Sequence, residues 1–220
     1  MEGLGVIVVI GAALVAPASP AAPQGSRLEH LALNQADMRR ASGALLRQSE
    51  LSGVRPGWRP LATVSDSDQL VCPWQNYSRY TPTGHGEADF QPTKIGNAGF
   101  VGSRVDVLAT TRDAVGKFEI DTHPGTVACE AEALRKALGA QLKTVSARQL
   151  PSPNVGKRAV AHEFVYEQAK RSPKRIYVTI IEFLRGRGVG VLNTMNFDAP
   201  GDETKRVALA RLIDGRLKGA

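Results

Sequence analysis

The stretch VGKRAVAHEFVYEQAKRSPKRIYVTIIEFLRGRGVGVLNTMN, residues 155–196, decides the fold class. It is rich in β-branched and aromatic residues, which is typical of strands, and turn residues interrupt it at 171–173 and 185–188. These interruptions divide it into three predicted strands: Val155–Glu167, Arg175–Leu184 and Gly188–Asn196. Because consecutive strands with short connections pair in opposite directions, the stretch predicts an antiparallel meander.

The residues before and after this meander predict one more strand and several helices. Residues 100–110 alternate apolar and polar side chains, which indicates a strand. Helix caps and apolar stripes of helical spacing predict helices at 35–48 behind the capping residue Asn34, near 113–118, at 128–143 and at 203–218.

Residues 52–100 are rich in Pro, Gly, Ser and Asp and predict long loops. They contain only short strand candidates, at Trp58–Val64 and Ala88–Phe90. A chain of 220 residues fits one ordinary domain. We therefore expect a single α+β domain over residues 33–220, with a mainly antiparallel sheet flanked by helices and with long loops.

The first residues resemble an export signal. Residues 4–15 form an uncharged apolar run, too short to span a bilayer, which takes about 20 residues. Ala16, Pro17 and Ala18 follow as an A-x-A cleavage site. We expect a signal peptide at 1–18, a flexible tether at 19–32, and a location outside the cell or in the cell envelope. The alternative for the apolar run is a buried strand.

Export would place the two cysteines, Cys72 and Cys129, in an oxidising compartment where an even number of cysteines is normally paired. We expect one disulfide between them, and the alternative is two free buried thiols. Their number and spacing exclude a C-x-x-C redox pair and a four-cysteine zinc site.

The formal net charge of +7 favours anionic surroundings, such as phospholipid head groups or cell-wall polymers. Arg and Lys are scattered along the whole chain, whereas a nucleic-acid interface gathers them on one element with interleaved aromatic residues. Nucleic acid is therefore not an expected partner.

Motifs for catalysis or metal binding are absent from the sequence. The four histidines stand in separate segments without metal-ligand spacing. Gly186, Gly188 and Gly190 lie between two predicted strands, which favours a hairpin turn over a phosphate loop that would precede a helix. We expect no catalytic residue, no metal site and no cofactor.

The loops near Cys72 bring aromatic and polar side chains together and are the candidate ligand site. The candidate residues are Trp74, Tyr77, Tyr80, His85, Glu87 and Asp89. The alternative is that polar loops tied down by a disulfide need no ligand.

Three segments and the closing helix carry a resemblance to a known group: VDVLATTRDAVGKF (105–118), ACEAEALRKAL (128–138) and FLRGRGVGVL (183–192). Over Phe100–Lys218 the chain resembles exported actinobacterial domains grouped with the extracellular sensor domain of mycobacterial serine/threonine receptor kinases, and PsbP-like folds more broadly. The resemblance implies a sheet flanked by helices, an envelope or extracellular location, and a role in binding or sensing an unidentified ligand.

Our preferred interpretation is a non-enzymatic exported domain that binds a small molecule or an envelope component. One alternative is an exported hydrolase with acid-base residues borne on loops, for which His85, Glu87, Asp89 and His123 are the candidates. Another is an electrostatic binder of anionic polymers or lipid surfaces.

Overall fold

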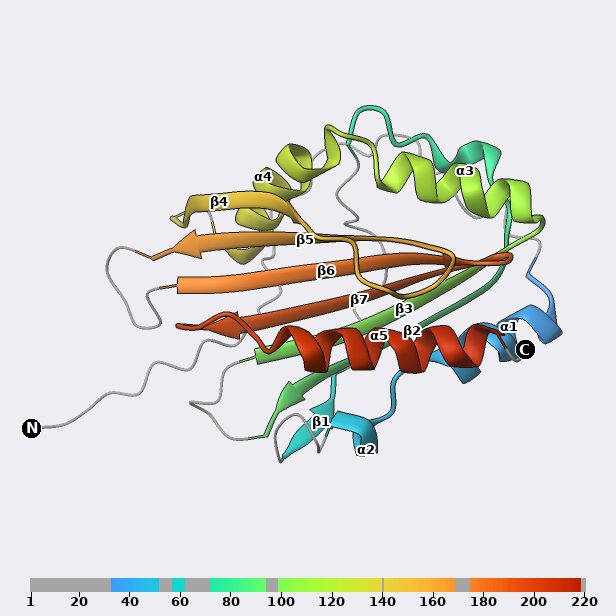
Figure 1. Cartoon of the computed structure of the whole chain (residues 1–220), viewed down its shortest axis with the longest axis horizontal. Coiled ribbons are helices and arrows are strands. Elements are labelled where there is room, and N and C mark those ends of the chain that lie inside the picture. The colour runs from blue at the N-terminus through green and yellow to red at the C-terminus, as the bar shows by residue number, and fades with distance from the viewer. Residues whose placement is uncertain are drawn as a thin grey trace, which may run out of the picture.

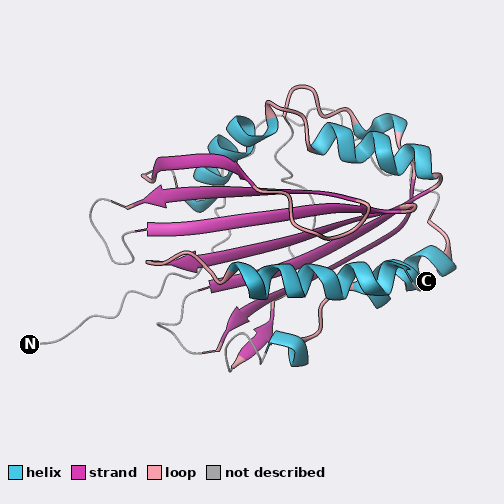
Figure 2. Cartoon of the chain, viewed as in Figure 1, coloured by secondary structure: helices cyan, strands magenta, loops and turns pink. Residues whose placement is uncertain are grey.

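Seven strands form a single sheet in the computed structural model, which describes residues 33–51, 57–61, 72–93, 99–139, 141–168 and 175–218 (Figures 1 and 2). The strands are β1 (Trp58–Pro60), β2 (Pro82–Pro92), β3 (Gly99–Leu108), β4 (Lys143–Leu150), β5 (Arg158–Glu167), β6 (Arg175–Arg185) and β7 (Gly188–Phe197). Their order is β1-β2-β3-β7-β6-β5-β4, and every neighbouring pair is antiparallel. The expected signal peptide and tether lie outside the described residues.

Helices cover both faces of the sheet. They are α1 (Gln35–Ala44), α2 (Gln48–Leu51), α3 (Thr111–Asp121), α4 (Thr126–Leu138) and α5 (Glu203–Lys218), with a 3₁₀ turn, η1, at Tyr77–Arg79. On one face α1 lies against β2 and α5, and α5 crosses in front of the sheet in Figure 1. On the other face α3 packs on β6 and β7, and α4 packs on β4 and β5. No helix of the described ranges has both the length and the apolar character needed to cross a membrane.

The α1 and α5 face holds one continuous apolar core. Side chains of a strand alternate between faces, so every second residue of each central strand points to the same helix layer. The core on this face includes Val101, Val105, Ile181, Phe183 and Leu192 of the sheet, and Ala41, Ala210 and Ile213 of the helices. Asn34 caps α1 as expected, since its Oδ1 accepts a hydrogen bond of 2.8 Å from the Asp37 N–H.

The α3 and α4 face is divided. One apolar cluster lies under α3 and includes Phe118, Leu184 and Val189. A second lies under α4 and includes Phe164 and Tyr166. Polar and charged side chains occupy the sheet between the two clusters, and this interruption positions the candidate site described below.

The observed architecture confirms the α+β class and the antiparallel meander of β5, β6 and β7. Gly186, with a φ of +57°, lies in the turn between β6 and β7, so the glycine-rich stretch is a hairpin. Helix α4 ends earlier than expected, at Leu138 before Gly139, whose φ is +141°. The edge strand β4 covers residues 143–150. Of these, the sequence placed residue 143 in the expected helix and assigned no element to residues 144–150.

Strand β2 is the larger departure, because residues 82–92 were expected mostly as loop. Their proline and glycine content disfavours a strand. The glycines serve close packing: a Cβ at Gly84 would lie 2.2 Å from the Asp37 carbonyl oxygen of α1. Contact with α1 therefore overrides local propensity, and the two prolines stand at the ends of the strand. His85, Glu87 and Asp89 consequently lie on a strand and not on loops.

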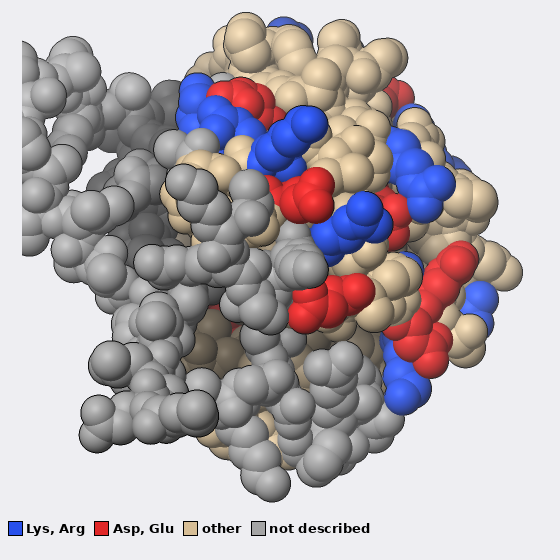
Figure 3. Space-filling view, turned by 90° about the vertical axis from the view of Figure 1, so that its left-hand side faces the viewer, with Lys and Arg blue, Asp and Glu red and all other residues tan. Residues whose placement is uncertain are grey.

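Charge is mixed on the end of the molecule that lies at the left of Figure 1. Basic and acidic side chains alternate over the part of this face that Figure 3 shows. The excess positive charge of the chain therefore does not gather there into one basic patch.

Candidate functional site

A cleft of about 240 Å³ lies between the two apolar clusters, on the face that α3 and α4 cover. We call it the central cleft. Its floor is the sheet, and its walls come from η1, the end of α3 and the middle of α4 through Tyr77, Asp121, Glu130 and Leu134. The cleft is therefore assembled from segments that are distant in sequence.

The floor consists of two rows of residues that run across β2, β3, β7 and β6. Residues paired across neighbouring strands point to the same face, so the pairing register sets each row. The first row is Glu87, Arg104, Val191 and Glu182, and the second is Asp89, Gly102, Asn193 and Ile180. All eight residues line the cleft.

Asp89 reaches over the middle of the second row because Gly102 has no side chain. A Cβ at Gly102 would lie 2.6 Å from Asp89 Oδ1. Burial, together with the negative charge of Glu87, raises the pKa of Asp89 to about 6. This carboxyl group therefore changes its charge within the range of pH in which proteins normally work.

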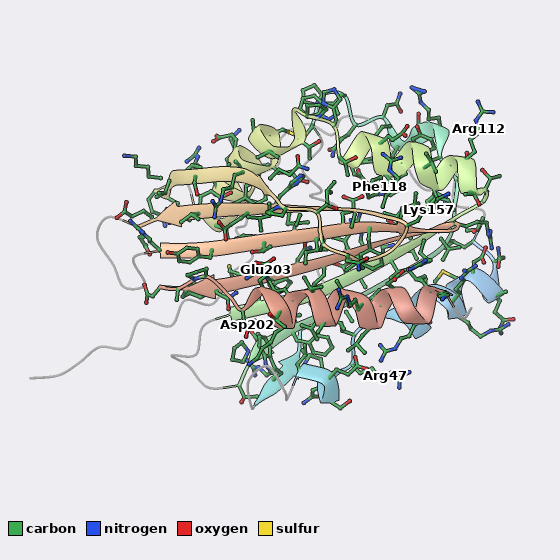
Figure 4. All side chains as sticks on the ribbon, viewed as in Figure 1. Arg47, Arg112, Phe118, Lys157, Asp202 and Glu203 are labelled. Carbon is green, nitrogen blue, oxygen red and sulfur yellow. A yellow bond between two sulfur atoms is a disulfide. The ribbon has the colours of Figure 1, made fainter. Side chains whose placement is uncertain are left out.

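A buried ion pair closes one wall. Lys117 Nζ lies 2.5 Å from Asp121 Oδ2, and both residues are buried on α3 beside Phe118, which Figure 4 labels. The Tyr77 hydroxyl donates a hydrogen bond to Asp121, and Lys117 Nζ lies 5.0 Å from the centre of the Tyr77 ring. Burial lowers the pKa of Lys117, but Asp121 and Asp106 outweigh that effect and raise it. The pair holds η1 against α3.

Glu182 lies on the floor beside this wall, and it is only 8% exposed. Burial and the negative charge of Asp121 raise the pKa of Glu182 well above its ordinary value. The neutral acid is therefore favoured when the cleft holds no positive charge close to Glu182.

Next to the floor, His85 and Asp106 form a pair. His85 Nδ1 lies 2.7 Å from Asp106 Oδ1, and Arg104 Nε and Lys117 Nζ lie 3.5 and 3.7 Å from Asp106 Oδ2. Burial would raise the pKa of Asp106, but Arg104, His85 and Lys117 hold it below its ordinary value. A carboxylate that orients a histidine is an arrangement used in acid-base catalysis.

Comparison with known proteins gives a structural match and no sequence match. No protein-family model matches the chain, and no curated protein matches its sequence. Among solved structures, it is similar to the extracellular domain of PknH from Mycobacterium tuberculosis, with a TM-score of 0.52 and 13% identity. The match covers 83% of this chain and 97% of that chain.

The two chains share a fold. Identity at this level shows the fold alone. The match agrees with the expectation that the chain has the fold of a mycobacterial extracellular sensor domain. It assigns no role to any residue of the central cleft.

The structure brings together part of the candidate set. Tyr77, Glu87 and Asp89 line the central cleft, and His85 lies in the next row of the sheet. Trp74 instead stacks on His123, with ring centroids 4.7 Å apart, and covers the turn before α4. Tyr80 packs against Gly116 of α3. These last two aromatic residues stabilise the walls and do not line the cleft.

Cys72 and Cys129 form a disulfide, as expected, across 57 residues of chain. Cys129 lies in the first turn of α4, and Cys72 is buried just before the segment that carries Tyr77. The bridge therefore ties the η1 wall of the cleft to the α4 wall.

Seven lining residues with polar side chains were not anticipated: Gln75, Ser103, Arg104, Asp121, Glu130, Glu182 and Asn193. A signal for Glu182 was present, because a carboxylate in the otherwise apolar run IIEFL (180–184) is unusual for a buried strand. Within the described part of the chain, no group of three or more His, Cys, Asp and Glu side chains is arranged to hold a metal ion.

Proposed function

We propose that this chain is an exported, sensor-like domain that binds a small polar molecule in the central cleft and performs no catalysis. The observation that carries the proposal is the polar interruption of an otherwise apolar helix-covered face. Polar groups that converge in a cleft between packed helices are typical of ligand sites. Burying charged residues costs stability, so a role in binding accounts for their presence there.

Three observations support a location outside the cytoplasm. The first residues resemble a cleavable signal. A disulfide joins the only two cysteines, and disulfides persist in oxidising compartments. The fold is similar to that of an extracellular domain. Each favours secretion or a place in the cell envelope, and together they support the exported part of the proposal.

Native mass spectrometry of the whole protein, purified from an exporting bacterial host, tests the binding part. The wild type is expected to retain a bound small molecule, whereas Leu134→Trp, which fills the wall of the cleft, is expected to lose it. Leu212→Trp is the matched control, because Leu212 is exposed on α5. A protein that carries no bound species, and that no polar metabolite of a thermal-shift panel stabilises, would overturn the proposal.

A hydrolase is the second candidate, and the His85–Asp106 pair favours it. In that case His85 would act as the base and Asp106 would orient it. His85→Ala and Asp106→Asn would then abolish turnover of an ester, peptide or glycan substrate. No turnover by the wild type on such panels would count against this candidate.

Electrostatic binding of anionic polymers or lipids is a third candidate, carried by the net charge of +7. Five carboxyl-bearing residues and one basic residue line the central cleft, so this binding would have to use the outer surface. It predicts binding to anionic vesicles that collapses between low and moderate salt, and binding insensitive to salt would exclude it.

A further inference from the structure

Three buried oxygen atoms in the central cleft accept no hydrogen bond. They are Glu130 Oε2, Glu182 Oε1 and Asn193 Oδ1. The carboxyl group of Glu182 also has a side-chain hydrogen bond with Asp121, so only its Oε1 atom is unpartnered. The nearest ion-pair contact of this set joins Glu130 Oε2 to His162 Nδ1 at 3.5 Å, which is long for a hydrogen bond. Buried acceptors normally have a donor, so three orphans in one cleft indicate a missing donor group.

The topology places these acceptors close together. Glu182 pairs with Val191, and Asn193 pairs with Ile180, so Glu182 and Asn193 are diagonal neighbours on β6 and β7. Diagonal neighbours on one face of a sheet are about 7–8 Å apart at their Cα atoms, within reach of one small group between their side chains. Glu130 enters from α4 above them, and its charge adds to the burial that raises the pKa of Glu182.

The cleft is also acidic, in contrast to the basic chain as a whole. Five carboxyl groups line it: Glu87, Asp89, Asp121, Glu130 and Glu182. Arg104 is the one basic residue among the described lining residues, and it also lies 3.5 Å from Asp106 outside the floor. Lys117 neutralises Asp121 from behind the wall. With Glu182 neutral in the empty cleft, the side chains that still give the lining its charge are Glu87, Asp89, Glu130 and Arg104. Carboxyl groups outnumber Arg104 in this set, so the cleft favours a cation, and a cation beside Glu182 would in turn favour its ionised form.

We propose that the ligand of the central cleft is an organic cation whose primary ammonium group donates to Glu130, Glu182 and Asn193. An ammonium group has three N–H donors and no acceptor, which matches three orphan acceptors. A hydrocarbon part of the ligand would lie against Leu134, Ile180 and Val191, the apolar side chains of the lining. This inference rests on the proposed binding function and specifies its ligand class.

Isothermal titration of the full chain with cadaverine, pentanediol and glutarate tests the inference, because the three probes share a five-carbon chain and differ in charge. Cadaverine is expected to bind at least about tenfold more tightly than pentanediol, and glutarate is expected not to bind. Magnesium chloride serves as the inorganic cation and is expected not to compete with cadaverine.

Variants locate the site. Glu182→Gln and Asn193→Leu, each close to the original side chain in size, are expected to weaken cadaverine binding about tenfold or more. Leu134→Trp is expected to abolish it. Glu132→Gln is the matched control, since Glu132 is an exposed carboxylate on α4 that pairs with Arg135 outside the cleft. A thermal melt of each variant confirms that it is folded.

The outcomes separate this inference from the proposed function. Cadaverine binding that survives both Glu182→Gln and Leu134→Trp would place the amine elsewhere and overturn the inference. If pentanediol or glutarate bound as tightly as cadaverine, and Leu134→Trp abolished that binding, the central cleft would remain a ligand site but its ligand would not have to be a cation. Binding of no probe, with no species carried in native mass spectra, would overturn both and leave a cleft filled by water.

Discussion

Arg187 Nη2 lies 2.7 Å from Asp37 Oδ1, and this pair joins the first turn of α1 to the β6–β7 hairpin across 150 residues of chain. The contact is bidentate, since Arg187 Nη1 also donates to Asp37 Oδ2 at 3.1 Å. Thr83 Oγ1 and Asn34 Nδ2 donate to the same carboxylate. One buried carboxylate therefore ties together α1, β2 and the hairpin.

Replacing this carboxylate should cost much stability. Burial would raise the pKa of Asp37, but hydrogen bonds from Thr83, Arg187 and Asn34 outweigh it and hold the pKa at about 2, below the ordinary 3.8. Asp37→Asn is expected to lower the free energy of unfolding by about 3 kcal/mol near neutral pH, measured by urea titration.

The pH dependence of that loss has a definite sign. Because the folded pKa of Asp37 is lowered, its stabilisation is present above about pH 4 and disappears as the pH falls towards about 2. The difference in the free energy of unfolding between the wild type and Asp37→Asn should therefore become smaller as the pH is lowered. Glu119→Gln, at an exposed carboxylate, is the control and should change stability by less than about 1 kcal/mol. An Asp37→Asn protein as stable as the wild type near neutral pH would show that the Asp37 carboxylate does not stabilise the fold.

Asp89 is expected to behave in the opposite way. Burial and the charge of Glu87 raise its pKa from 3.8 to about 6, so the carboxyl group ionises more readily in the unfolded chain. The fold therefore loses stability as the pH rises through that interval. Asp89→Asn should have a higher melting temperature than the wild type at about pH 8 and an equal one at about pH 4, when measured without added amines. A difference independent of pH would contradict the raised pKa.

The predictable parts of the fold are the strands whose own residues indicate a strand, without any information from their neighbours in the sheet. β5, β6 and β7 are long, rich in β-branched residues and separated by turn residues, so local sequence was sufficient. β4, an edge strand, buries none of its residues fully, so its sequence KTVSARQL lacks the apolar content of a core strand. β2 contains glycines that only the packing of α1 explains.

The candidate site was predictable in part for a similar reason. Tyr77, Glu87 and Asp89 stand within one polar segment, and their clustering is visible in sequence. Glu182 and Asn193 join them through the pairing of β3 with β7 and of β7 with β6. Alternation along a strand indicates which residues share a face, but the order of strands in the sheet comes from tertiary structure. A single sequence therefore could not bring these rows together.

Loss of the disulfide should loosen the walls of the central cleft. The bridge closes a loop of 57 residues, which in the chain-entropy model contributes about 4 kcal/mol. The double variant Cys72→Ser with Cys129→Ser is expected to melt at a lower temperature and to show faster amide hydrogen exchange around Tyr77. Dithiothreitol should lower the melting temperature of the wild type only, since the double variant has no bridge. Equal effects on both proteins would show that the reductant acts elsewhere.

A glycine in the hairpin provides a test that separates packing from phosphate binding. Gly190 pairs with Phe183, and a Cβ at Gly190 would lie 2.4 Å from the Cζ atom of the fully buried Phe183 ring. Gly190→Ala is therefore expected to cost about 1–3 kcal/mol in urea titration, because the core cannot accept the added methyl group. Gly215→Ala, on an exposed turn of α5 with open space at its Cβ, is the control and should be neutral or stabilising by up to about 1 kcal/mol.

The double variant Gly190→Ala with Phe183→Leu completes this test. Shortening the ring leaves room for the new methyl group, so the pair should be more stable than the sum of the two single losses predicts. A coupling energy of at least about 0.5 kcal/mol is expected, since the two residues are in contact. If Gly190 served instead to let a phosphate approach the backbone, Phe183→Leu would not offset the effect of Gly190→Ala. The losses of stability in the two single variants would then add. Additive losses would therefore contradict the packing role, whereas favourable coupling assigns the glycine to the ring that covers it.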